Sequence, residues 1–347
     1  MDNALIAVVD DARFDAHRAM EPHPERPERL VAARKGLRNA SKPENEVSIA
    51  ARRATDGEVL RVHSESYVAR LRDRLQAGSG WGHIDADTFF SPGTEDAAWL
   101  AAGGAVDICR AAIEGPTRRG IALLRPPGHH ARPSEAMGFC LLNNIAIAAA
   151  DALSRGLSRV AIVDWDVHHG NGTQDIFYED ERVLFISLHE SPLYPGTGGL
   201  AERGRAAGEG YTINLPMPAG SGPNVYGSAF REVVLPALGA FEAQMVLVSA
   251  GFDAHQRDPL ASLELDAGCF AAMTTALVRH VDTLGHGRLA LFLEGGYDLD
   301  ALEESVGAVT RALLGHEVEL PNGSLSSAEE RALFHAKQSA QRHWPIA

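Results

Sequence analysis

The chain has 347 residues, of which 45% are hydrophobic and 22% are charged, and its formal net charge is −14. This length is sufficient for a sizeable core, whereas the acidic balance argues against a broad basic face that would bind nucleic acid. No apolar run approaches the ~20 residues of a bilayer span, and Cys109, Cys140 and Cys269 are too scattered for a disulfide framework. We therefore expect a cytoplasmic globular protein with no membrane or nucleic-acid partner, and a homo-oligomer is not excluded.

Short apolar runs typical of buried β-strands alternate with helical patterns along the chain. The predicted strands occupy residues 5–9, 120–125, 160–166, 183–189, 245–253 and 289–297. The predicted helices occupy residues 27–40, 66–78, 94–115, 141–156, 225–243, 270–285 and 299–315. This alternation indicates an α/β fold with a mostly parallel central sheet of about eight strands and helices on both faces. We expect a single domain over residues 1–347, whose tail from about residue 316 adds a peripheral helix starting near Ser327.

Polar residues gather at the ends of four predicted strands. In an open parallel sheet, ligands bind beyond the carboxyl ends of the strands. A lone aspartate after a strand more often caps a backbone amide, but four strands that end in such residues predict a functional site. These residues are His129, His130, Asp164, Asp166, His168, Asp253 and Tyr297.

The spacing Asp166-Val-His168 suits a metal ion, because alternate residues of an extended chain project to the same side. Asp253, brought in from another strand, is the natural third ligand. Two carboxylates and one imidazole fit Zn²⁺ or Fe²⁺ and leave a position for water, as catalytic sites require. A calcium site is less suitable, since it would use more oxygen ligands and little imidazole.

Seven motifs in order along the chain resemble the histone deacetylase and acetylpolyamine amidohydrolase family, whose fold is arginase-like. They are PHPERPERL (22–30), RPPGHHA (125–131), GFCLLNN (138–144), VDWDVHHGNGTQDIF (163–177), SLHESPLYPGTG (187–198), SAGFDAHQRDPL (249–260) and LEGGYDL (293–299). The sequences of the motifs DWDVHHGNGT and LEGGY are similar to those of the class II deacetylases and their bacterial relatives. The resemblance implies a zinc-dependent amidohydrolase that removes acetyl or other short acyl groups from N-acyl-lysine or related amines.

The resemblance also implies a role for each residue at the strand ends. Asp166, His168 and Asp253 match the zinc ligands, and Tyr297 matches the catalytic tyrosine. His129 and His130 match the paired histidines. Asp164 matches the acid that orients His129, while Asn171 falls where some members carry an aspartate facing His130.

These roles agree with the chemistry of the residue types. Zn²⁺ would polarise an acyl carbonyl and lower the pKa of a bound water toward ~7. His130 would act as general base, and the hydroxyl of Tyr297 would donate to the oxyanion. His129 would give electrostatic support. No serine or cysteine nucleophile is needed.

The family's acyl-chain tunnel is implied to be lined by Gly138, Phe139, Tyr194, Leu260 and Gly296. Tyrosine at 194 departs from the phenylalanine common there. Arg29 matches an arginine near the inner end of the tunnel, where released acetate would leave; its alternative is an ordinary arginine on a helix surface.

Monovalent cation sites are a further implication of the resemblance. An inner K⁺ site is expected at Asp164, Asp166, His168, Ser187 and Leu188. An outer site is indicated more weakly by Phe177, Val183 and Tyr211, while Asp180 does not match.

Three alternatives to a deacetylase that acts on acyl-lysine stay open, and Asp87 has two alternative roles. The substrate could be an acetylated polyamine, but Leu260 replaces the acidic gatekeeper of the polyamine specialists, and residues 10–23 are short for their dimerisation loop. Asp87 would hold a substrate amide or ammonium, or only cap a turn. A binuclear manganese ureohydrolase and a non-catalytic binder of acylated ligands are less consistent with Tyr297 and the paired histidines.

Overall fold

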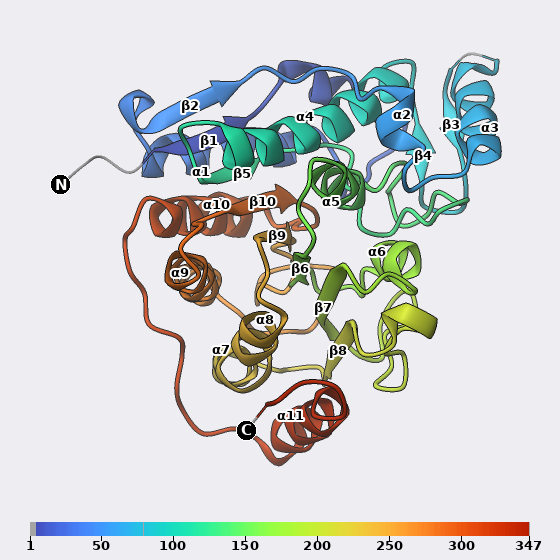
Figure 1. Ribbon diagram of the computed structural model, residues 1–347. Helices are drawn as coiled ribbons and strands as arrows, with labels where there is room; N and C mark the ends of the chain where they lie inside the picture. The colour runs from blue at the N-terminus through green and yellow to red at the C-terminus, as the bar shows by residue number, and fades with distance from the viewer. Residues whose placement is uncertain (1–4, 79, 347) are drawn as a thin grey trace.

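The computed structural model describes residues 5–78 and 80–346, and its centre is an eight-stranded sheet (Figure 1). The strands lie in the order β2-β1-β5-β10-β9-β6-β7-β8, and every neighbouring pair is parallel. Their bounds are β1 (Ile6–Val9), β2 (Glu46–Ile49), β5 (Arg119–Ala122), β6 (Val160–Asp164), β7 (Val183–Glu190), β8 (Thr212–Met217), β9 (Met245–Ala250) and β10 (Leu289–Leu293). A separate antiparallel pair joins β3 (Gly82–His83) to β4 (Phe89–Phe90). The predicted α/β class and parallel sheet are confirmed.

Two sets of helices cover the sheet (Figure 1). In one set α1 contacts α10, α10 contacts α9, and α9 contacts α7 and α8, while in the other α4 contacts α5 and α5 contacts α6. The bounds of the helices are α1 (Glu28–Ala40), α2 (Asp56–Val59), α3 (Glu65–Gln76), α4 (Thr94–Glu114), α5 (Asn144–Ser154), α6 (Asn171–Phe177), α7 (Pro223–Ala229), α8 (Leu235–Phe241), α9 (Ala267–Thr283), α10 (Leu299–Leu313) and α11 (Ser327–Ala340). Short 3-10 helices span Ala12–Ala16, Pro43–Asn45 and Ala206–Gly208.

The central strands are buried along their whole length. Every residue of β6, β7, β9 and β10 is buried. Helices on both faces explain why these strands are apolar throughout rather than alternating. β9 and β10 end at Ala250 and Leu293, earlier than predicted, because the polar loops that carry the site begin there.

The structure departs from the predicted elements at the two edge strands and in the helix predicted over residues 225–243. β2 and β8 are edge strands, and β2 is only partly buried, so it has no continuous apolar run. The helix predicted over residues 225–243 is divided by a π-helical segment, Phe230–Val234, just before Pro236. Proline lacks the N–H that a regular helix would use there.

The C-terminal helix α11 packs against β8 and so covers one edge of the sheet (Figure 1). Beyond it, Trp344 Nε1 donates to the carbonyl of Gly210 at 2.8 Å, which ties the chain end to the loop before β8. Within residues 5–78 and 80–346, no helix has both the length and the apolar character that crossing a membrane requires.

Candidate active site

The polar residues singled out in the sequence converge at the carboxyl edge of the sheet. β6 lies beside β9, and β9 lies beside β10, so the loops that follow these strands are neighbours. They carry Asp166 and His168, Asp253, and Tyr297, respectively. The loop after β5, on the far side of β10, brings His129 and His130 to the same place.

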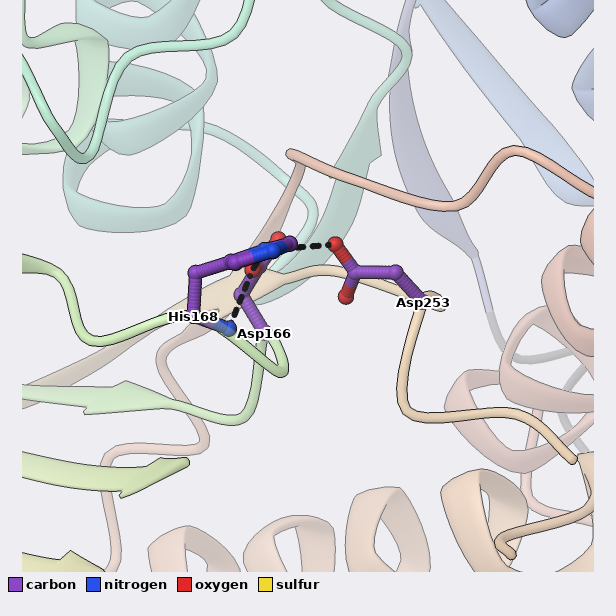
Figure 2. A group of neighbouring side chains, drawn as sticks. All are labelled: Asp166, His168 and Asp253. Carbon is purple, nitrogen blue, oxygen red and sulfur yellow. Dashed lines mark hydrogen bonds and ion pairs between the residues drawn. The ribbon is translucent and has the colours of Figure 1, made fainter. Parts of the chain in front are cut away.

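Asp166, His168 and Asp253 form a compact group of side chains (Figure 2). Their potential ligand atoms all lie within 4.8 Å of one another. His168 Nδ1 is 3.2 Å from Asp166 Oδ1 and 3.2 Å from Asp253 Oδ2. Backbone amides hold the carboxylates, since Gly295 donates to Asp166 Oδ2 at 2.8 Å and Val167 donates to Asp253 Oδ1 at 2.9 Å.

This group fits a divalent cation. Asp253 Oδ2 is buried, and among the described residues it accepts no hydrogen bond of good geometry; its one close cationic neighbour is the His168 ring at 3.2 Å. A buried carboxylate oxygen with so little compensation is costly. Burial disfavours a charged imidazole, yet Asp166 and Asp253 outweigh it and raise the pKa of His168 to about 10. The negative field that favours this proton would also favour a metal ion. Two carboxylates and one imidazole are ligands suited to Zn²⁺.

The two histidines of the pair have different partners. His129 Nδ1 lies 3.0 Å from Asp164 Oδ2, and both side chains are buried. Burial opposes protonation of His129, but Asp166 and Asp164 outweigh it and raise its pKa to about 10. His130 Nδ1 instead lies 2.8 Å from the amide oxygen of Asn171. Burial, His129 and His168 lower the pKa of His130 well below its usual range. The surroundings therefore favour the charged form of the His129 ring and the neutral form of the His130 ring.

Tyr297 comes from the loop after β10 and lines the same cavity as the two histidines. Burial raises the pKa of its hydroxyl well above the usual range, although Arg29 acts in the opposite direction, so the hydroxyl stays a hydrogen-bond donor at neutral pH. The Arg29 guanidinium lies 4.9 Å from the centre of the Tyr297 ring. Arg29 Nε also donates to the carbonyl of Gly296 at 2.7 Å, which fixes the turn before the tyrosine.

A cavity of about 230 Å³ opens above these groups. Of the residues predicted to line a tunnel, Gly138, Phe139, Tyr194 and Leu260 lie in its wall. Gly296 does not; the wall contains Gly295 instead, and the carbonyl of Gly296 accepts a hydrogen bond from Arg29 Nε. The remaining lining residues are Asp87, Pro127, His129, His130, Cys140, His168, Leu193 and Tyr297.

The wall formed by Gly138 and Phe139 has an unusual backbone. Both residues have positive φ, 57° and 68°, and Phe139 is one of few non-glycine residues in that region. A Cβ on Gly138 would lie 2.5 Å from His130 Cδ2, so only glycine allows the loop to pass this close to the imidazole. The Phe139 amide donates to Thr88 Oγ1 at 3.2 Å, which supports the strained conformation.

Arg29 is fully buried, so it is not the helix-surface arginine of the alternative interpretation. Its Nη1 lies 3.3 Å from Glu25 Oε1, and Glu25 also accepts from Arg125 Nε at 2.5 Å and Nη2 at 2.9 Å. This buried ion-pair group lies directly behind the Tyr297 loop, because Arg29 Nη2 donates to the carbonyl of Glu294.

Three residues of the expected inner cation site, Asp164, Ser187 and Leu188, are neighbours in the sheet, while Asp166 and His168 follow β6. Asp164 lies opposite Ser187 in the register of β6 and β7, and Leu188 follows in β7. Ser187 Oγ is 2.9 Å from His189 Nδ1. The weaker outer set lies around the α6–β7 connection and the start of β8, at Phe177, Val183 and Tyr211. The cation sites stay predictions.

Three residues of this region were not assigned a role from the sequence. Glu294 accepts from the amides of Gly128 at 2.6 Å and His129 at 3.2 Å. Asp258 accepts from the amide of Tyr297 at 2.7 Å. Cys140, interpreted as a small buried residue, is buried but lies in the cavity wall. The position of Glu294 directly after an apolar strand could have indicated a role at the site. Asp258 gives no such indication, because an aspartate before a proline is common in ordinary turns.

Comparison with known proteins agrees with this architecture. The histone deacetylase domain matches residues 23–313. A probable deacetylase of Archaeoglobus fulgidus is 42% identical over 328 residues, covering 94% of this chain and 89% of that protein. The polyamine deacetylase HDAC10 of Homo sapiens is 39% identical over 336 residues, covering 92% of this chain and 49% of that protein. The crystal structure of the HDA15 HD domain has a TM-score of 0.91 and 39% identity, covering 99% of this chain and 96% of that chain.

The fold and these matches define a deacetylase-type hydrolase that acts on amides. The chain belongs to the histone deacetylase family.

Proposed function

We propose that this protein is a zinc-dependent deacetylase that hydrolyses N-acyl amines, with Asp166, His168 and Asp253 as the metal ligands. The observation that carries the proposal is the convergence of these three side chains, with ligand atoms within 4.8 Å of one another, beside a cavity whose wall contains His168, His130 and Tyr297. When bound, the ion would supply polarisation of the acyl carbonyl and a water molecule of lowered pKa.

The protein's own residues would move the protons. Because His130 Nδ1 faces an amide oxygen, Nδ1 carries hydrogen and Nε2 keeps a lone pair. His130 would take a proton from the attacking water and pass one to the leaving amine. His129, held as an imidazolium beside Asp164, would supply positive charge near the developing oxyanion. The Tyr297 hydroxyl would donate a hydrogen bond to that oxyanion.

The substrate class favoured is acyl-lysine in peptides, or short acylated amines more broadly. Leu260 lies in the cavity wall, so an apolar side chain stands where an acid could select a second ammonium group. Acetylated polyamines are the alternative, and one relative carries the name polyamine deacetylase. We further propose that residues 1–347 act as one domain and that K⁺ binds at the inner site beside Asp164 and Ser187.

A side-by-side activity panel tests the proposal. The substrates are acetyl-lysine peptides, longer acyl-lysine peptides, acetylputrescine and acetylspermidine, and the enzymes are wild type, Tyr297→Phe and the control Tyr178→Phe. Tyr178 follows α6 and does not line the cavity. Tyr297→Phe should keep its metal content and lower kcat by about 10²–10³ on every substrate, because one oxyanion donor is lost.

The control should behave like the wild type. Undiminished turnover by Tyr297→Phe would remove the oxyanion role of this residue. A preference for acetylspermidine over every peptide would replace acyl-lysine by the polyamine alternative.

A further inference from the structure

The loop that carries Tyr297 has little intrinsic rigidity. Tyr297 lies four residues beyond the end of β10 and precedes α10, and residues 294–298 form no regular secondary structure. Two glycines come directly before it, and Gly296 has a φ of 118°. Glycine gives this segment wide backbone freedom, so other contacts must fix the direction of the tyrosine side chain.

Asp258 provides such a contact on the amide of Tyr297 itself. Its Oδ2 accepts from Tyr297 N at 2.7 Å and from Asp298 N at 3.4 Å. Its Oδ1 accepts from Leu260 N at 3.0 Å. One carboxylate therefore joins two loops, and each loop contributes a side chain to the cavity wall, namely Leu260 and Tyr297.

The contacts of Asp258 distinguish it from an ordinary surface acid. It is 7% exposed, and among the described residues it has no ion pair with a lysine, arginine or histidine. Burial and the neighbouring Asp253 raise the pKa of Asp258 to about 7. A buried carboxyl group without a cationic partner is unfavourable unless its hydrogen bonds compensate, and here these bonds go to the two cavity loops.

We propose that Asp258 is a positioning residue for Tyr297: its carboxylate fixes the backbone that aims the tyrosine hydroxyl into the cavity. Arg29 restrains the same loop through different atoms, the carbonyls of Glu294 and Gly296. The inference rests on the proposed oxyanion role of Tyr297. Asp258 acts through Tyr297 and does not touch the substrate.

A double-mutant cycle tests this proposal. Asp258→Asn keeps the size of the side chain, but its NH₂ group must then face a backbone N–H of one loop. When Tyr297 is intact, Asp258→Asn should lower kcat by about 10- to 100-fold and change KM little, as expected for misplacement of a catalytic group. In the Tyr297→Phe background, Asp258→Asn should lower kcat by less than about twofold, since the positioned hydroxyl is already absent.

The control is Asp266→Asn, which alters a similar aspartate that accepts from Cys269 N at 2.8 Å at the start of α9. It should lower the melting temperature without changing kcat. If Asp258→Asn does not fold, Asp258→Glu, which keeps both oxygens but is one methylene longer, should show the same dependence on Tyr297.

The outcomes separate the two proposals. Equal losses of kcat in both tyrosine backgrounds, or no loss in either, would overturn the positioning role alone, provided that Tyr297→Phe is impaired. Full activity of Tyr297→Phe would overturn both.

Discussion

The side-chain oxygen of Asn171 lies 2.8 Å from Nδ1 of His130, whereas the neighbouring His129 faces the carboxylate of Asp164 at 3.0 Å. Asn171 Nδ2 is directed away, toward Met137 Sδ at 3.3 Å, so it is the amide oxygen that faces the ring. An amide oxygen accepts a hydrogen bond but adds no charge. The two histidines thus share a cavity but differ in the charge of the group behind them.

Asn171→Asp should move the acidic limb of the pH profile upward. A carboxylate beside Nδ1 would favour the imidazolium and raise the pKa of His130, which burial, His129 and His168 hold well below its usual range. Since the neutral ring accepts the proton, activity would be lost at a higher pH, by about 1–3 pH units. The measurement is kcat/KM as a function of pH. Asn224→Asp in α7 adds the same charge elsewhere, and an equal shift in that variant would contradict the local explanation.

Gly295→Ala should lower the affinity for metal without unfolding the protein. A Cβ at this position would overlap Asp253 Oδ2 and lie 2.7 Å from Asp166 Oδ2, so both carboxylates must move. The metal content per chain and the zinc dissociation constant test this expectation. Gly57→Ala in α2 is the matched control, because its Cβ would meet no atom within 4 Å. Unchanged zinc affinity in Gly295→Ala would argue against the proposed ligand set.

Chelation should abolish turnover while the fold is retained, because the sheet is held by its apolar core and not by the ligand loops. Re-addition of Zn²⁺ should restore the activity and raise the melting temperature with increasing concentration, as a ligand specific for the folded state does. Metal analysis should give one ion per chain. Two manganese ions per chain would instead favour the ureohydrolase alternative, and a rate insensitive to chelators would place the reaction at another site.

Glu25→Gln should reduce the free energy of unfolding by about 3–5 kcal/mol, because it leaves the buried Arg29 and Arg125 without their carboxylate. Although burial opposes ionisation, Arg125, His17 and Arg29 lower the pKa of Glu25 from 4.5 to about 2. Its ionisation therefore stabilises the fold above pH 4.5, and this stabilisation is lost as the pH falls toward 2. Urea unfolding at pH 7 and pH 3 measures both effects.

The control for this stability prediction is Glu114→Gln, whose pair with Arg155 is largely exposed. It should change the free energy of unfolding by less than about 1 kcal/mol. If both variants changed the free energy of unfolding by a similar amount, the buried ion-pair group would contribute no more to stability than an exposed pair.

Leu260→Glu should shift the substrate preference toward acetylspermidine. A carboxylate in the cavity wall could pair with a second ammonium group of the substrate, and a partly exposed pair contributes about 1 kcal/mol, or about fivefold in kcat/KM. The ratio of kcat/KM for acetylspermidine to that for an acetyl-lysine peptide measures the shift. Leu260→Gln has a similar shape without charge, and an equal shift in that variant would show that charge is not the cause.

The site residues that directly follow an apolar strand could be predicted from the sequence. Asp166, His168 and Asp253 could be placed together because parallel strands end at one edge. The roles of Asp258 and the burial of Arg29 could not be predicted, since each depends on a partner far away in the chain, Tyr297 for the first and Gly296 for the second. Edge strand β2 could not be predicted, because it has four residues, three half-buried and one exposed, and so carries almost no periodic signal.

The order of the strands has a consequence for the synthesis of the protein. β10 is the last strand in the chain, yet it lies between β5 and β9 and so joins the N-terminal strands β2, β1 and β5 to the remaining four. The two groups of strands can therefore be joined only after residues 289–293 have been synthesised. A chain truncated before residue 289 would lack both the joining strand and Tyr297, so the completed sheet and the complete site depend on the same late segment of the polypeptide.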